Sequence, residues 1–392
     1  MITPSGGAQG YWDAIRAGNP IHIEMLFSKG TLLTENNIEI SSGITIQDLM
    51  NSDSDMVVGK SVCKQFTARI FLNDENRNID WQDRFRLRFG VDINGSTSWL
   101  TYGYFNGVKP KRTVGIDVLD YVAYDDMIKF EASAKNFLEN VDYPITAEDL
   151  LDAIGDEVGV SVLSTSLSEP SYVLEAEMTE NDLDGFDTYR EIIEAFAEAT
   201  CTYAKMSSAG TCEFVWYGDE QSSSDCVTIG MTDQFAVDHN DIYGNGMNWN
   251  IFNNRSWYNL EHGSARWNGL LGHYSVTNAI GTVWIENRYG TDSSYRASNN
   301  NNQYWFVDNV FMKDGNNLSA KWYADRFKEF GGQLPMTVEC IGNWMLETGD
   351  YVDIILEESQ VIHMPIYNRT LRYNGTITDV LETTGELFSK LK

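Results

Sequence analysis

The sequence predicts a mainly β protein with α+β insertions, and three observations support this. Hydrophobic residues make up 42 % of the 392 residues and charged residues 22 %, a composition that is typical of folded chains. Apolar residues alternate with polar ones between residues 20 and 125 and again after residue 335, whereas they recur at helical spacing between residues 146 and 200. Because the chain exceeds the usual size of a single core, we expect two to four compact units.

Residues 20 to 125 predict several short antiparallel strands. The alternation is clearest in Arg84–Phe89, where Phe85, Leu87 and Phe89 share one face and three arginines share the other. Turn-forming residues interrupt the region at Asn73–Asn76, Asn94–Gly95 and Asn106–Gly107. This pattern is expected for an antiparallel barrel or a sandwich with hairpins.

Two helices and two strands are predicted in the middle of the chain. The first helix follows a capping-box-like start at Thr146–Asp149, and the second follows Thr188, which has Glu191 at capping-box spacing. The apolar residues of the second helix recur at i, i+3, i+4, i+7 and i+8: Tyr189, Ile192, Ile193, Phe196 and Ala197. With strands expected at 200–206 and 211–216, this is a small α+β unit of roughly 90 residues.

The rest of the chain returns to the β class after a region of unusual composition. Residues 240–304 are rich in Asn, Gly, Trp and Tyr. So many tryptophans require a packed environment, and we favour a core role over a glycan-binding platform. A third helix is expected from Ser319 to Gly331–Gly332, because glycine commonly ends helices. The strands predicted after it are 336–341, 351–356, 361–367 and 371–381, with a turn at Asn374–Gly375.

The charge of the chain argues against nucleic-acid binding. There are 57 Asp and Glu residues against 28 Lys and Arg, a formal net charge of −29. Such a surface lacks the cations that neutralise phosphates, although the same excess is also consistent with simple solubility. The first twenty residues do not resemble a secretory signal, and no run of about 18 apolar residues predicts a membrane span. We therefore expect no membrane anchor.

No familiar catalytic or metal-binding motif occurs. The five cysteines lie far apart, so we expect no disulfide framework and no zinc site, while the spacing leaves a Cys201–Cys212 bridge open. The five histidines are scattered, which favours structural roles. Asp120, Asp125 and Asp126 are expected at a strand end, bonded to backbone amides, rather than across a glycosidase cleft. We expect no enzyme: no catalytic residue, no metal and no cofactor.

Four passages follow one another in a recognisable order across residues 100 to 385. They are Thr101–Gly107 with Gly115–Glu131; Tyr143–Thr146 with Leu150–Leu151; Thr188–Ala197; and Asp308–Asn309, Gly342–Ile354 and Asn374–Ile377. In this order they resemble phage tail-tip proteins, namely the baseplate hub of contractile phages and the hub module at the start of siphophage tail-associated lysins. The chain departs from the family where Trp344 and Met345 replace a proline-containing turn, and residues 245–305 have no familiar counterpart.

The resemblance implies two tube-like antiparallel β barrels plus smaller α+β domains. It implies a first barrel at 1–128, an α+β domain at 129–224, and a second barrel at 225–392 with an Asn/Trp-rich and helical insertion at about 266–332. The implied function is a structural tail-tip or baseplate hub of a phage or tail-like particle, made in the bacterial cytoplasm. A homotrimer would join the six-fold tail tube, or a distal tail protein, to a three-fold spike or tip protein.

The tape-measure protein is a further implied partner, and DNA would pass through the lumen without specific binding. Two alternatives stay open. One is a tail-associated glycan-binding adhesin, supported by the Trp-rich region. The less favoured one is a cell-wall hydrolase, against which the missing motifs argue. Because the family's lysins carry a peptidase domain beyond the hub and this chain stops at Lys392, the resemblance implies the hub alone.

Overall fold

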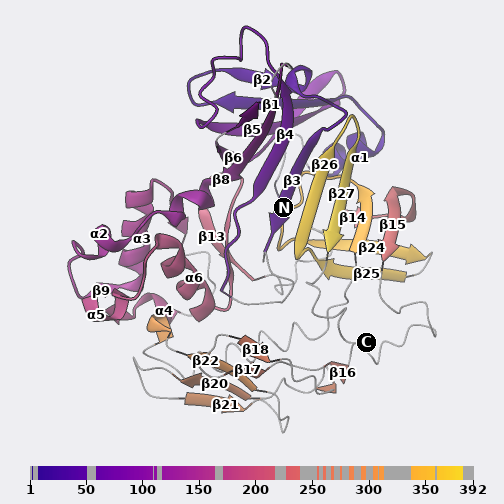
Figure 1. Ribbon diagram of the computed structural model, residues 1–392. Helices are drawn as coiled ribbons and strands as arrows, with labels where there is room; N and C mark the ends of the chain where they lie inside the picture. Colours follow the sequence, from indigo (N-terminus) through magenta and orange to yellow (C-terminus); the bar gives the residue numbers. More distant parts are fainter. Residues whose placement is uncertain are drawn as a thin grey trace.

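The computed structural model describes a large antiparallel sheet with a helical lobe beside it (Figure 1). The described residues are 2, 8–50, 59–108, 110–112, 117–163, 171–216, 227–238, 309–312, 337–357 and 360–382, with seven short strands between 254 and 307. Two hydrophobic cores are buried, one under the sheet and one within the lobe. In the described part of the chain, no helix is long and apolar enough to cross a membrane.

The large sheet has twelve strands in the order β15-β23-β27-β26-β3-β4-β8-β6-β5-β1-β2, with β7 paired to β8. Its strands are β1 (Ile21–Phe27), β2 (Leu32–Thr34), β3 (Ile44–Leu49), β4 (Gln65–Phe71), β5 (Arg84–Ile93), β6 (Ser96–Gly107), β7 (Lys111–Arg112), β8 (Val118–Asp125), β15 (Gln234–Asp238), β23 (Thr337–Ile341), β26 (Asn368–Tyr373) and β27 (Ile377–Glu382). Every pair in it is antiparallel, as the short alternating segments predict.

Strand β5 confirms the predicted alternation, since Phe85, Leu87 and Phe89 are all buried. The β5–β6 turn is confirmed too, with Asn94 and Gly95 at φ of 51° and 82°. The turn predicted at Asn106–Gly107 is wrong, because both residues lie within β6 and pair with β8. Gly107 serves close packing instead: a Cβ there would lie 1.8 Å from the carbonyl oxygen of Trp81.

The two β regions of the chain join in one sheet through β3 and β26. Six consecutive pairs align from Asn368↔Leu49 to Tyr373↔Ile44, so strands more than 300 positions apart share a ladder. Figure 1 shows the yellow β26 and β27 next to the indigo β3. In the described residues the sheet does not close on itself: β2 and β15 are its two ends. The prediction of two separate tube-like barrels is thus not confirmed.

The lobe between the two β regions is the predicted α+β unit. Its elements are η2 (Asp126–Glu131), α2 (Lys135–Leu138), β9 (Ile145–Thr146), α3 (Ala147–Val158), β10 (Val162–Leu163), α4 (Ser171–Leu174), β11 (Glu177–Met178), α5 (Glu180–Leu183), α6 (Tyr189–Ala199), β12 (Tyr203–Met206) and β13 (Cys212–Val215). Thr146 and Thr188 cap α3 and α6 by accepting hydrogen bonds from backbone amides, as predicted. Phe196 of α6 packs edge-on against Phe214 of β13, with ring centroids 4.7 Å apart.

The remaining elements lie around these two bodies. They are α1 (Ala8–Arg16), η1 (Glu35–Asn37), β14 (Val227–Ile229), η4 (Met231–Asp233), β16 (Asn254–Arg255), β17 (Asn259–Glu261), β18 (Arg266–Asn268), β19 (Tyr274–Ser275), β20 (Thr282–Glu286), β21 (Ser293–Arg296), β22 (Gln303–Val307), η5 (Val310–Met312), β24 (Tyr351–Glu357) and β25 (Gln360–Pro365). Helix α1 was not predicted; it buries Tyr11, Trp12, Ala14 and Ile15. The helix predicted from Ser319, and the tryptophan side chains of 245–305, lie outside the described residues.

A buried polar junction as the candidate functional site

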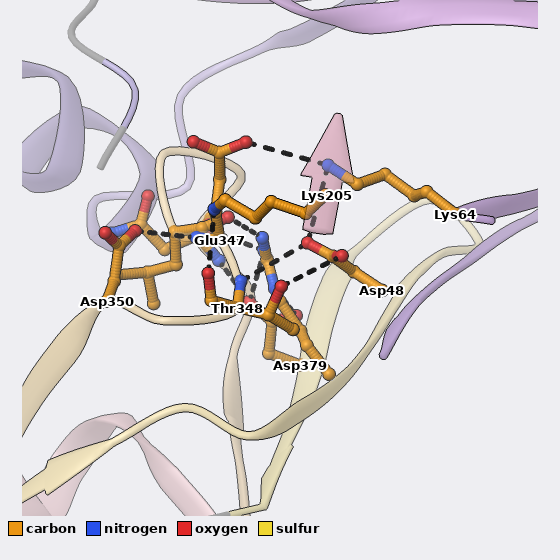
Figure 2. A network of polar contacts seen from close by, with 10 residues as sticks. Asp48, Lys64, Lys205, Glu347, Thr348, Asp350 and Asp379 are labelled. Atoms are coloured by element: carbon orange, nitrogen blue, oxygen red, sulfur yellow. Dashed lines mark hydrogen bonds and ion pairs between the residues drawn. The ribbon is translucent and has the colours of Figure 1, made fainter. Parts of the chain in front are cut away.

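A cluster of buried polar side chains lies where the N-terminal strands, the lobe and the C-terminal strands meet (Figure 2). We call it the polar junction. Its members come from β3, the residue before β4, β12, the loop 342–350, β26 and β27: Asp48, Lys64, Lys205, Asn343, Glu347, Thr348, Asp350, Arg369 and Asp379. All are buried except Lys205, which is half-buried. The loop belongs to the Gly342–Ile354 passage that carries the sequence resemblance.

Arg369 and Asp379 form the fully buried ion pair of the junction. The guanidinium donates two parallel hydrogen bonds to the carboxylate, Nε to Oδ1 at 2.9 Å and Nη2 to Oδ2 at 2.8 Å. It also donates to the backbone carbonyls of Asn343, at 2.7 Å, and Leu346. The backbone amide of Asn343 donates to Asp379 Oδ2 at 2.8 Å. This fork-shaped, two-bond geometry is the strong form of an ion pair, and it holds the loop against β26 and β27.

The loop 342–350 is also held by its own side chains. Asn343 Oδ1 accepts from the amide of Met345 at 3.1 Å, and Asp350 Oδ2 accepts from the amide of Glu347 at 2.7 Å. Gly349 has a φ of +91°, and a Cβ there would lie 3.0 Å from Cγ1 of Val215 in β13. The left-handed turn therefore favours a glycine, and a Cβ would also make a tight contact with the lobe.

Asp48, Lys64 and Lys205 connect the loop to the other two regions. Asp48 accepts from the amide and the hydroxyl of Thr348, at 3.3 and 3.2 Å. Lys64 Nζ lies 3.4 Å from Asp48 Oδ2 and 3.6 Å from Glu347 Oε1. From the lobe, Lys205 Nζ donates to the carbonyl of Thr348 at 2.8 Å. All three regions of the chain thus converge on one loop.

The electrostatic environment of the junction favours the charged forms of Asp48 and Lys64. Burial opposes the ionisation of Asp48, but Lys64, Lys205 and Arg369 together lower its pKa. Burial likewise opposes the charge on Lys64, and the surrounding carboxylates, Asp48 above all, raise its pKa. The charges are therefore stabilised by one another in a site that is largely shielded from water. Such an arrangement fixes the relative position of segments, and it leaves no accessible acid, base or nucleophile.

Trp344 of the loop 342–350 makes an aromatic contact with the large sheet. The Trp344 ring stacks on Phe89 of β5, with centroids 4.3 Å apart and planes at 7°. Its indole N–H donates to the hydroxyl of Tyr11 in α1, and that hydroxyl donates to the Phe89 carbonyl at 3.2 Å. Trp344, at which the sequence departs from the family, therefore anchors α1 and β5 to the loop.

The residues singled out in the sequence are placed as follows. Asp125 caps η2, and its carboxylate accepts from the amide of Met127 at 3.2 Å, as predicted. Asp126 instead binds side chains, among them Arg84 and Lys129. Asp120 lies inside β8, where it pairs with Arg69 at 2.8 Å, so its predicted place at a strand end is wrong.

The thiols and the histidines show no shared site in the described residues. Cys63, Cys201, Cys212 and Cys340 form no disulfide bond, so the bridge that the spacing of Cys201 and Cys212 left open is not made. Among the residues that the structure describes, no group of three or more His, Cys, Asp or Glu could hold a metal ion. His22 lies 3.2 Å from both Glu35 and Asp92 at the surface of the sheet.

Sequence reasoning missed the polar junction, although a signal was present. Asp48, Arg369 and Asp379 lie on the inward faces of β3, β26 and β27, where their neighbours at two-residue spacing are buried apolar residues. A charged residue on the apolar face of a strand requires a buried partner. Three such residues on adjacent strands predict a buried ionic cluster.

Solved structures of other proteins share this architecture. The tail protein of Neisseria meningitidis superposes with a TM-score of 0.52 at 11 % identity, covering 94 % of this chain and 98 % of that one. The chain has the fold of a phage tail protein. The 43 kDa tail protein of prophage MuSo2 from Shewanella oneidensis matches at a TM-score of 0.49 and 11 % identity, covering 93 % and 98 % of the two chains. Prophage tail protein gp18 of Listeria monocytogenes matches at 0.49 and 11 %, covering 95 % and 96 %.

No protein-family model matches the chain, and no curated protein matches its sequence. The likeness is therefore one of tail-protein fold over almost the whole length of the chain. It agrees with the sequence resemblance, whose last passage builds the loop of the polar junction. Sequence identity this low carries the fold and leaves function to be argued from the molecule itself.

Proposed function

We propose that the chain is a structural hub at the tip or baseplate of a phage tail or a tail-like particle, acting as a homotrimeric adaptor. Its partners would be the six-fold tail tube or a distal tail protein on one side, a three-fold spike or tip protein on the other, and the tape-measure protein. The observation that carries the proposal is a single sheet, in a tail-protein fold, that unites the N-terminal and C-terminal strands. The polar junction holds these strands and the lobe together.

The two ends of the sheet offer the surfaces that a ring requires. At one end, Leu32 of β2 is 46 % exposed; at the other, Met231 and Phe235, beside and within β15, are 54 % and 60 % exposed. Head-to-tail contacts between unlike surfaces generate a closed ring when the rotation between subunits closes. Apolar contacts would also oppose the repulsion between copies that each carry −29.

Six tube-like units arise from three chains if each chain contributes two. We propose residues 1–128 and 225–392 as these units, with 129–224 as the α+β domain between them. Three chains would then match a six-fold tube to a three-fold spike. Superposing β1–β8 on the C-terminal strands tests this duplication, and unrelated strand orders would contradict it.

Electron microscopy of the particle with a gold-labelled antibody against this chain tests the location. We expect label at one end of the tail only. Label along the whole tube, or none on the particle, would contradict the proposal. The proposal also assigns the chain no lytic chemistry, so clearing of bacterial cell walls in a zymogram of the purified protein would overturn that part.

A further inference from the structure

The negative charge of the chain is concentrated in the lobe. Residues 129–224 carry 21 acidic and 4 basic side chains, a net −17, whereas residues 1–128 carry 16 and 12, a net −4. Helix α3 contributes Glu148, Asp149, Asp152, Asp156 and Glu157, all exposed, and contains no basic residue. More than half of the net charge of −29 thus belongs to about a quarter of the chain.

An open groove of about 530 Å³ lies in this lobe between α2, the following loop and α3. Its apolar lining consists of partly exposed side chains: Phe137, Val141, Ile145 and Ala153. The carboxylates of Asp142 and Glu157 lie among them, and none of the described residues that line the groove is basic. The groove therefore combines an apolar floor with a negative rim.

A second hollow of about 210 Å³ lies on the other side of the same segment. Leu138 and Tyr143 line it, whereas their neighbours Phe137 and Val141 line the groove, so the segment 135–145 forms the ridge between the two. Lys135, the basic residue of this hollow, is paired with Asp187 at 2.7 Å. Asp187 therefore offsets part of its positive charge.

We propose that the groove between α2 and α3 docks a basic amphipathic helix of a partner protein. An amphipathic helix places apolar residues at i, i+3, i+4 and i+7 into an apolar groove. Its Lys and Arg residues would then face Asp142, Glu157 and the exposed carboxylates of α3. Charge complementarity selects this occupant over a second copy of the chain, since two lobes that each carry −17 repel one another.

The inference is independent of the hub proposal, because it rests on the groove and its charge alone. The probe is a fluorescein-labelled 18-residue helix of leucine and lysine in amphipathic order, titrated with the full-length protein and followed by anisotropy. The control peptide has the same composition in scrambled order. We expect micromolar binding of the amphipathic peptide that weakens with salt, and at least about tenfold weaker binding of the scrambled one.

Two groove variants and one matched control locate the binding. Ala153→Arg fills the floor, and the double variant Asp142→Lys/Glu157→Lys reverses the rim. Asp74→Lys/Glu75→Lys makes the same change of net charge on an exposed turn outside the lobe. Thermal melts establish that each variant is folded.

We expect each groove variant to weaken binding at least about tenfold and the control to change it less than about twofold, because contacts at the site outweigh net charge. Equal weakening by the groove and control variants, equal binding of both peptides, or no binding by the wild-type protein would each overturn the proposal.

Discussion

The polar junction and the outer face of α3 use the same residue types in opposite ways. In the junction, the carboxylates of Asp48 and Asp379 are buried against cations and backbone amides. On α3, five carboxylates are exposed within one helix of twelve residues. A buried charge requires a partner, whereas an exposed charge is satisfied by water. The difference teaches that, in this acidic chain, buried charge holds segments together and surface charge is available for association.

The largest effect is expected from breaking the buried ion pair. Arg369→Ala leaves Asp379 buried and frees the carbonyls of Asn343 and Leu346. Removing one partner of a buried pair typically costs about 3 to 5 kcal/mol, so the free energy of unfolding in denaturant should fall by that amount. The double variant Arg369→Met/Asp379→Leu should recover most of the loss. A change below about 1 kcal/mol for Arg369→Ala would show that water reaches the junction.

A loss of stability of similar size is expected when a side chain in the core of the lobe is truncated. This variant distinguishes the stability of the lobe from that of the sheet. Phe196 is fully buried and packs against Phe214 and Phe311, with centroids 4.7 and 5.4 Å away. Phe196→Ala should cost about 3 to 5 kcal/mol. In limited proteolysis we expect cleavage first within the lobe, whereas Arg369→Ala should open the sheet as well. Identical cleavage patterns would contradict the division into two bodies.

The local features of the fold were predictable from sequence, and the long-range ones were not. The starts of α3 and α6 depend on capping contacts three residues apart, which a pattern reveals. The loop 342–350 depends on contacts with distant residues: Thr348 with Asp48, 300 positions apart, and Trp344 with Tyr11, 333 positions apart. No local period encodes these pairs, although the charged Asp48 on the inward face of β3 marked one side of the first pair.

The turn predicted at Asn106–Gly107 failed for a related reason. The pair is a favourable turn signal, but tertiary contacts decide: Asn106 donates to Asp126 at 2.9 Å, and Gly107 makes room for Trp81 and Tyr121. The same signal at Asn374–Gly375 does form a hairpin, with Gly375 at a φ of 96°. Asn374–Gly375 lies between β26 and β27, which have six residues each, and a Cβ on Gly375 would come no closer than 3.4 Å to another atom.

A smaller effect, with a pH signature, is expected at Asp125 near the junction. Burial raises the pKa of Asp125 to about 7, with Lys64 opposing the shift and Asp48 adding to it. The unfolded state loses this proton at about pH 4 and the folded state at about pH 7, so this residue makes the protein less stable as pH rises between them. We therefore expect the free energy of unfolding of Asp125→Asn, measured in denaturant relative to that of the wild type, to rise by about 2 kcal/mol from pH 5 to pH 8. A difference that stays constant with pH would contradict the assigned environment.

The smallest effect is expected on the outer face of α3. Asp152→Asn and Asp156→Asn change exposed carboxylates that water already satisfies, so the melting temperature should stay within the error of the measurement. The same substitution at the junction, Asp379→Asn, should lower the melting temperature clearly, because Arg369 loses its charged partner. Equal effects at the two sites would remove the contrast between buried and surface charge.

The number of copies per ring in an assembled particle tests the central claim most directly. If each chain contributes two tube-like units, as we propose, a six-unit ring forms only when three chains close around the axis. Electron cryo-microscopy of the tail that carries this chain should resolve three copies at the tip, related by three-fold symmetry, with β2 of one copy facing β15 of the next. Six copies per ring, or one, would contradict the adaptor account.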